Sequence, residues 1–239
     1  MALACGDPLT ALAVFQESLA IYRAVGDGFG AAISLADLAL AHLSGNELAP
    51  AAARLDQALQ ESRSLGDDGL ILLCLQQLVR IARLNGDLAR AEHIGAEVLE
   101  TLTRGGRGHG MVGETTFLLG EVAEDQGQLP RAIERYRGGI ALLWQGGYRR
   151  TLPLAFEAYA RVASRARHFQ RAVVLAGAAA AMRERLASPI PPLEKMRLDQ
   201  ALMAAREQLG EAAVTAAWEI GETMSWDQAI ASALEEDDG

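Results

Sequence analysis

Apolar and small residues recur along this chain at helical spacing and are interrupted by short turns rich in glycine and aspartate. In the stretch from Gly86 to Leu99, a Gly-Asp pair precedes a run in which Ala91, Gly95 and Val98 stand four and three residues apart. This spacing places the three side chains on one face of a helix, and a Gly-Asp turn ends one helix and begins the next. Their small size predicts close contact with a neighbouring helix.

The same pattern returns along the chain at nearly constant intervals. The alanine five residues after the turn recurs at steps of 40, 40, 41 and 40 residues, as Ala11, Ala51, Ala91, Ala132 and Ala172. The helix before each turn repeats with the same step, and one of its columns reads Leu35, Leu75, Thr116 and Phe156. A period of this size made of two helices indicates a solenoid, in which each hairpin buries its apolar face against its neighbours.

The repeats predict where the chain divides. The first predicted helix, residues 8–24, has the pattern of the second helix of a pair, so the chain is expected to begin in the middle of a repeat. Complete repeats are expected over residues 29–65, 67–104, 109–144 and 151–185. We therefore predict a repeat solenoid over residues 1–187.

The periodicity ends after Ala172, and the segment from Ser188 to Pro192 contains three prolines. Proline fits the first turn of a helix, so a helix is predicted from Pro191 to Gln208. Two shorter helices are predicted over residues 211–224 and 225–234, the last with Ser225 as its N-cap. Residues 188–239 are thus expected to form a C-terminal helical cap continuous with the solenoid.

Composition and charge exclude several classes of protein. Half of the residues are hydrophobic and only 5% are aromatic, which favours helices packed through small side chains over an aromatic β core. The net charge is −9, and no cluster of basic residues has the size of a nucleic-acid-binding surface, so direct DNA or RNA binding is not expected. No signal peptide or membrane-spanning apolar run is present, which predicts a cytoplasmic protein without membrane contact.

No group of residues predicts catalysis, a cofactor or a metal site. The four histidines, His42, His93, His109 and His168, share no ligand spacing, and Cys5 and Cys74 form neither a metal motif nor a disulfide framework. The Gly-rich segment from Thr103 to Gly110 has backbone amides and arginines that suit a phosphate or carboxylate. It lacks a preceding strand, a lysine and a Ser/Thr, which favours a flexible loop between repeats. The three tryptophans, Trp144, Trp218 and Trp226, are expected to pack in the core or the cap.

The repeat columns resemble those of the tetratricopeptide repeat (TPR). The third complete repeat carries the small residues, the turn glycine, the early alanine and the aromatic residue of that family as Gly120, Gly127, Ala132, Tyr136 and Gly139. The resemblance covers residues 6–185 and implies a right-handed α-solenoid. The 40-residue period exceeds the usual ~34 residues and the signature Trp and Pro are missing, so longer helices are expected.

The long-period repeats, together with the segments Pro191–Glu194, Ala216–Glu219 and Trp226–Ile230, resemble the sensor region of large ATP-dependent LuxR-type bacterial transcription regulators. In that family an NTPase module precedes the repeats and a helix-turn-helix often follows them. This chain contains no GxxxxGK[ST] motif and no basic recognition helix after Leu234, so the resemblance implies neither ATP hydrolysis nor DNA binding here. It implies the regulatory middle of such a protein, or a relative that lost both ends.

The resemblance to TPR proteins also implies a binding surface, because the first helix of each TPR pair lines a concave groove. The candidate groove positions are Ile33, Ala36, Leu40 and Leu43, then Leu73, Gln76, Arg80 and Arg83, then Glu114, Phe117, Glu121 and Glu124, and finally Leu154, Glu157, Arg161 and Ser164. One interpretation is a solvated face on which Arg80 and Glu121 neutralise each other across adjacent repeats. The other is a groove for a peptide or a small effector, with apolar and arginine contacts to an extended or helical segment.

We therefore predict a non-enzymatic protein-interaction or effector-sensing domain of a bacterial transcription or signalling regulator. The alternative is a self-associating scaffold or adaptor, in which a second copy of the chain covers the unpaired first helix. An enzyme is a third interpretation, which no arrangement of residues supports.

Overall fold

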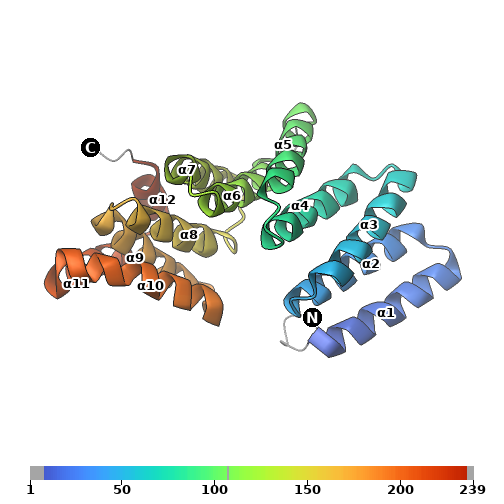
Figure 1. Cartoon of the computed structure of the whole chain (residues 1–239), viewed down its shortest axis with the longest axis horizontal. Coiled ribbons are helices and arrows are strands. Elements are labelled where there is room, and N and C mark those ends of the chain that lie inside the picture. The colour runs from blue at the N-terminus through green and yellow to red at the C-terminus, as the bar shows by residue number, and fades with distance from the viewer. Residues whose placement is uncertain (1–7, 107, 236–239) are drawn as a thin grey trace. The chain divides into compact units, whose positions relative to one another are not determined.

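The computed structural model describes residues 8–106 and 108–235, and every regular element in these ranges is an α-helix (Figure 1). The predicted all-α class is confirmed. Cys5, Arg107 of the Gly-rich segment and the acidic end of the chain lie outside the described residues. The helices are α1 (Pro8–Val25), α2 (Gly28–Ser44), α3 (Leu48–Leu65), α4 (Asp68–Leu84), α5 (Leu88–Arg104), α6 (His109–Asp125), α7 (Leu129–Gln145), α8 (Leu152–Arg165), α9 (Phe169–Arg185), α10 (Pro192–Leu209), α11 (Glu211–Thr223) and α12 (Trp226–Leu234).

The chain divides into two compact units, Met1–Val98 and Leu99–Gly239, with the boundary inside α5. The predicted division at residue 188 falls between α9 and α10, and both of these helices belong to the second unit. The predicted cap is therefore part of one compact unit with α6–α9.

In the first unit, helices that follow one another along the chain pack together: α1 on α2, α2 on α3, and α3 on α4. Leucines fill the space between them, and Leu35, Leu38 and Leu55 are fully buried. The Arg23 side chain of α1 donates a hydrogen bond to the Glu61 carboxylate of α3 at 3.1 Å, on the surface of the unit.

The repeat alanines occupy equivalent buried positions. Ala11, Ala51, Ala91, Ala132 and Ala172 each have 0% of their surface exposed. The aspartates of the turns cap the helices that follow: Asp27 accepts a hydrogen bond from the Gly30 amide at 3.0 Å, and Asp67 accepts one from the Leu70 amide at 2.9 Å. These carboxylates satisfy backbone donors that the first turn of a helix leaves free.

Left-handed backbone conformations repeat with the same period. One series of positive φ values stands in the turns before Ala51, Ala91, Ala132 and Ala172, at Asn46, Gly86, Gly127 and Arg167. A second series stands in the turn after that alanine's helix, at Gly26, Gly66, Gly106, Gly147 and Ala187. Glycine adopts this conformation without steric cost. Asn46, which tolerates this conformation, adopts it at φ of 58°, and Arg167 and Ala187 adopt it at 69° and 48° although their side chains disfavour it.

In the second unit, α6 to α9 also pack in chain order, and three later helices cover them. Helix α10 lies on α8 and α9, α11 lies on α9, and α12 lies on α7 and α9. The predicted Ser225 N-cap is confirmed, since its hydroxyl and the Gln228 side chain form a reciprocal capping box. Trp226 of α12 stacks on Trp144 of α7 at 6.1 Å between ring centroids, which confirms packing roles for these two tryptophans.

Helices α9 and α11 approach each other closely through Gly177 and Gly221. A Cβ atom at Gly221 would lie 2.8 Å from the Ala178 backbone nitrogen and closer still to the Val174 carbonyl oxygen. A Cβ atom at Gly177 would lie 2.5 Å from the Trp218 carbonyl oxygen. The hydrogen atoms of glycine are therefore required on both sides of this contact.

Candidate functional site

The candidate groove positions of α8 are polar, yet they are buried. Glu157 has 1% of its surface exposed and Arg161 has 7%, and Ser164 is also buried. Helix α10 packs on α8, so these residues do not line an open groove. In this structure a later segment of the same chain covers Glu157 and Arg161, and their assignment to a binding surface stays a prediction.

Arg161 links three helices through its guanidinium group. Its Nη1 donates to Glu194 of α10 at 3.1 Å, and its Nη2 donates to Glu124 of α6 at 3.3 Å. The Tyr136 hydroxyl donates to the same Glu124 carboxylate at 2.7 Å, and the Arg165 side chain donates to it at 3.4 Å. We call Glu124, Tyr136, Arg161 and Glu194 the Arg161 network.

The electrostatics of the network favour a charged arginine. Burial alone would lower the pKa of Arg161, but the carboxylates of Glu124, Glu194 and Glu121, together with Tyr136, raise it above its ordinary value. Burial, the Glu124 and Glu121 carboxylates and the hydrogen bond to Glu124 raise the pKa of Tyr136 well above its usual value. At neutral pH the network therefore contains a guanidinium cation between carboxylates. The Tyr136 phenol is neutral and donates a hydrogen bond to Glu124.

Further hydrogen bonds from side chains of α8 and α9 hold α10 and the segment before it. Both oxygens of the Glu157 carboxylate accept hydrogen bonds from Arg183 of α9, at 2.5 Å from Nε and 2.9 Å from Nη2. Arg183 also donates to the carbonyl oxygens of Ser188 and Pro189, each at 3.3 Å. The Ser164 hydroxyl donates to the Ala201 carbonyl oxygen of α10 at 2.5 Å. Arg161 and Ser164 of α8 thus bind α10, and Glu157 binds the α9 arginine that holds the leading segment.

The other predicted groove residues lie in several environments. On α6, Phe117 is buried against the Tyr136 ring at 5.6 Å between centroids, Glu121 is buried, and Glu124 is half-buried in the Arg161 network. Glu114 accepts a hydrogen bond from the Thr151 hydroxyl at 3.4 Å.

On α4, in the first unit, Gln76 is buried and Arg80 and Arg83 are half-buried. Glu121 belongs to the second unit, so the predicted neutralisation of Arg80 by Glu121 stays a prediction.

Sequence reasoning missed Glu194 and Arg183, the partners that bring the polar residues of α8 together. Glu194 follows two prolines and stands in the first turn of α10, where an acidic residue needs no partner to be favourable. No periodic relation joins it to Arg161, since α10 lies outside the repeats. A buried arginine facing two carboxylates from other elements is visible only in the folded chain.

The possible metal ligands and the thiol of Cys74 can be placed in the described part of the chain. No group of three or more His, Cys, Asp or Glu side chains there is arranged to hold a metal ion. Cys74 is buried, and burial raises the pKa of its thiol to about 11, which keeps it protonated and a poor nucleophile at neutral pH. Among the described helices, none combines the length and the apolar character that a membrane span needs.

Comparison of the sequence with models of known protein families and with curated proteins finds no match. The resemblance to TPR proteins and to the sensor region of LuxR-type regulators therefore stays a prediction from the residues quoted above.

Proposed function

We propose that this chain is a non-catalytic protein-interaction or effector-sensing repeat domain of a bacterial transcription or signalling regulator, built as a solenoid of TPR-like hairpins. The observation that carries the proposal is the polar inner face of α8, where Arg161 and Ser164 bind α10 and Glu157 binds Arg183 of α9, which in turn binds the segment before α10. This is recognition of a helix by a helical surface, with charged and hydrogen-bonding side chains supplying specificity. In a regulator, a partner helix would compete with α10 for the same surface.

Helix α10 has the properties of an exchangeable occupant. Of its 18 residues only Leu198, Leu202 and Ala205 are buried. Its outer side exposes Leu193, Met196 and Met203 to solvent. A helix that buries so few side chains opens at low free-energy cost compared with the core helices. Its release would uncover the charged face of α8 and change the packing that the rest of a multidomain protein experiences.

A peptide exchange experiment tests this proposal. A fluorescent peptide with the sequence of residues 189–210 is titrated into the full chain carrying Glu194→Gln, and anisotropy reports binding. Glu194→Gln weakens the contact of α10 with Arg161 of α8, so the wild-type peptide is expected to replace the internal helix. The peptide competes with an internal segment whose effective concentration is in the ~1 mM range, so it is titrated to that concentration.

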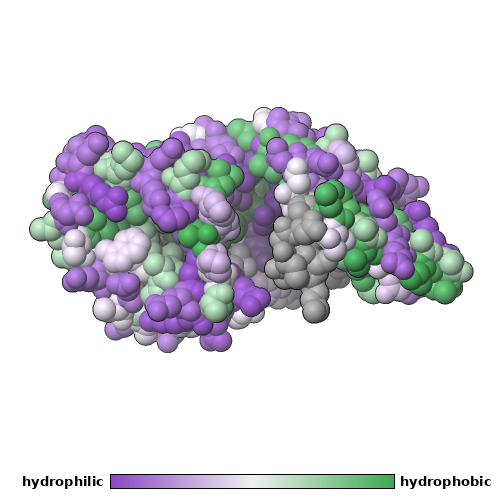
Figure 2. Space-filling model, turned by 90° about the horizontal axis from the view of Figure 1, so that it is seen from below, coloured by the Kyte–Doolittle hydropathy of each residue, from purple (hydrophilic) through white to green (hydrophobic). Residues whose placement is uncertain are grey.

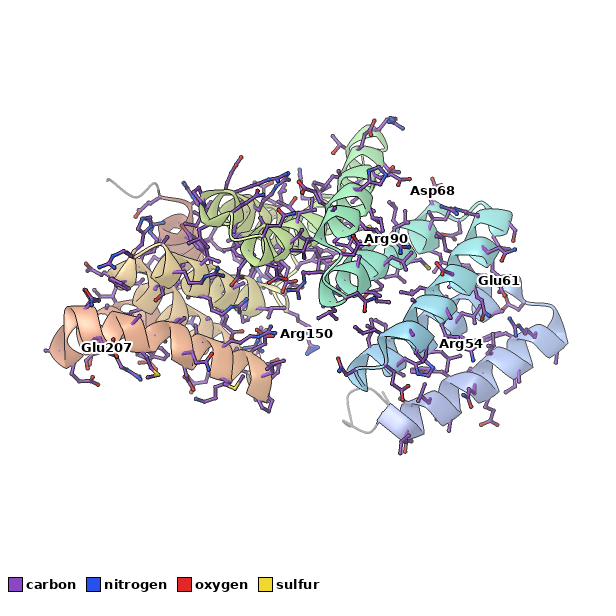
Figure 3. All side chains as sticks on the ribbon, in the orientation of Figure 1. Arg54, Glu61, Asp68, Arg90, Arg150 and Glu207 are labelled. Carbon is purple, nitrogen blue, oxygen red and sulfur yellow. The ribbon has the colours of Figure 1, made fainter. Side chains whose placement is uncertain are left out.

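The matched control is Glu207→Gln, because Glu207 lies on α10 and is exposed (Figure 3). The control chain is expected to bind the peptide as weakly as the wild type, and amide hydrogen exchange in α10 is expected to rise only in Glu194→Gln. Equal peptide binding and equal exchange in both variants would overturn the proposed helix exchange.

Self-association is a second candidate function, favoured by an apolar stripe on α1. Val14, Ile21 and Val25 stand seven and four residues apart and are exposed, up to 72% for Val25. Figure 2 views the chain from the side of α1 and shows apolar atoms at the surface over this helix. A second copy of the chain is the proposed occupant. Sedimentation equilibrium is expected to show a dimer that Ile21→Glu dissociates, and a wild-type monomer at high concentration would reject this candidate.

A further inference from the structure

A cavity of about 270 Å³ lies in the second unit, between α8, α9, α10 and α11. Its apolar walls are Trp218 of α11, Ala176 and Ala180 of α9, Leu198 of α10 and Ile190 of the segment before α10. The two alanines contribute only methyl groups, which leaves the space beside the indole unfilled. Two of the three tryptophans, Trp144 and Trp226, stack on each other, and the third, Trp218, lies beside this cavity instead.

The polar side chains of the cavity are arranged in neutral pairs. Glu157 and Arg183 pair through two hydrogen bonds at 2.5 and 2.9 Å, and Lys195 and Asp199 pair at 2.6 Å on the exposed side of α10. Each nitrogen of Arg183 already donates to Glu157, Ser188 or Pro189. A carboxylate offers about four lone-pair sites, so Glu157 still has acceptor capacity. The cavity therefore has apolar walls, no net charge and a buried acceptor.

We infer that this cavity binds a neutral, planar aromatic molecule that carries one hydrogen-bond donor. The ring would contact Trp218 and Leu198, and the donor would reach the Glu157 carboxylate. An apolar cavity of ~150 Å³ is known to bind benzene, so about 270 Å³ leaves room for two fused rings. Charged ligands are disfavoured because every charge in the lining already has a partner.

This inference rests on the proposed function in one respect only: the molecule bound in the cavity is taken to be the effector that the domain senses. Leu198, Lys195 and Asp199 belong to α10 and Ile190 to the segment before it, so a molecule in the cavity contacts the helix that is proposed to exchange. Such a ligand would stabilise the position of α10 and oppose its replacement by a partner helix.

Indole is the probe for the test, with the full chain labelled with ¹⁵N. The side-chain N–H signal of Trp218, assigned with Trp218→Phe, is expected to shift on titration with a Kd of about 0.1–1 mM, as suits a ligand of this size. Ala180→Leu fills the cavity and is expected to weaken binding at least about tenfold. Ala204→Leu, on the exposed side of α10, is the matched control and is expected to bind indole like the wild type.

Benzothiophene tests the role of Glu157, since it has the shape of indole without the N–H donor. It is expected to bind at least about fivefold more weakly, because a hydrogen bond to a buried carboxylate is lost. Ala180→Val replaces Ala180→Leu if circular dichroism shows that the leucine variant is unfolded. Indole binding that Ala180→Leu or Ala180→Val leaves unchanged, or no binding at all, would overturn the site. Equal affinity for both probes would overturn the acceptor role of Glu157.

The outcome is independent of the peptide experiment. A chain that exchanges the α10 peptide but does not bind indole would retain the proposed function and lose only this ligand site.

Discussion

Helices α2 and α8 occupy equivalent places in the repeat, but their corresponding side chains differ in chemistry. Ala36, Leu40 and Leu43 of α2 stand at the repeat positions of Glu157, Arg161 and Ser164 of α8. The α2 side chains are apolar and buried or half-buried, as expected for a helix packed against its neighbours in sequence. The α8 side chains are polar and buried, because α10 covers them, and their partners come from α10 for Arg161 and Ser164 and from α9 for Glu157.

The comparison shows that one helical scaffold tolerates different chemistry at a given position. Whether a position requires an apolar or a polar side chain depends on the element that packs over it. Buried polar groups are stable only with partners, so the charged face of α8 requires a cover that supplies them. In the first unit, the corresponding type of interaction is a surface ion pair, Arg23–Glu61, with 55% and 32% of the two side chains exposed.

The largest expected effect comes from removing the buried arginine, Arg161. Arg161→Met keeps much of the side-chain volume but removes the buried cation that the half-buried carboxylates of Glu124 and Glu194 share, which leaves them only the more exposed Arg165 and Arg197. We expect the free energy of unfolding to fall by about 3–5 kcal/mol. Urea unfolding followed by tryptophan fluorescence measures this, because Trp144, Trp218 and Trp226 all belong to the second unit.

Arg23→Met is the matched control in the first unit and is expected to change the free energy of unfolding by at most about 0.5 kcal/mol. Circular dichroism reports on this variant, because the first unit has no tryptophan. If both substitutions had the same small effect, the difference between the two polar environments would be disproved.

The contact between α9 and α11 gives the next largest expected effect. Gly221→Ala places a methyl group against the backbone of Val174 and Ala178, so α11 must move away. We expect a loss of about 3 kcal/mol, measured by thermal unfolding with tryptophan fluorescence. Gly138→Ala is the control, because its Cβ would meet only a Thr116 methyl group at 3.9 Å. It is expected to be neutral or to stabilise α7 by up to about 1 kcal/mol, and an equal loss in both variants would contradict the close-packing argument.

Alkaline pH tests the first unit through Cys74. Its pKa is raised by burial from the ordinary 9.0 to about 11, so the unfolded chain loses the thiol proton at lower pH than the folded chain. The stabilising contribution is complete below pH 9 and is lost as pH rises towards 11, a change of about 2–3 kcal/mol. Urea unfolding by circular dichroism at a series of pH values measures it. Cys74→Val is expected to remove this loss, and an unchanged pH profile in that variant would contradict the assignment.

The turns give the smallest effects and compare the two units directly. Ala187 and Gly66 occupy the same turn of the repeat at φ of 48° and 67°. Ala187→Gly is expected to stabilise the chain by up to about 1 kcal/mol, because it relieves a left-handed alanine. Gly66→Ala is expected to destabilise it by about 1 kcal/mol, although no atom lies within 4 Å of its added Cβ. The midpoint of thermal unfolding by circular dichroism checks both signs, and shifts in the same direction would show that backbone strain is not the cause.

Local patterns predicted much of the helical structure. The spacing of the repeat alanines placed five fully buried residues, and the prolines after Ser188 placed the start of α10. The start of α12 could be predicted from Ser225, because an N-cap interaction joins residues only three positions apart in sequence. The burial of Glu157 and Arg161 was not predictable, because their cover comes from a helix outside the repeat. The cavity beside Trp218 depends on four helices and has no signature in the sequence.

The sequence alone therefore determined the helices, their period, their caps and the buried column of small residues, because these features depend on neighbours within one or two turns of the chain. Only the tertiary structure decided which face of α8 is covered, what neutralises Arg161 and where space remains beside Trp218. Those outcomes depend on contacts between residues at least 26 positions apart, such as Arg183 with Glu157 and Arg161 with Glu124. Such contacts form only when the packed helices bring these side chains together and exclude water from them.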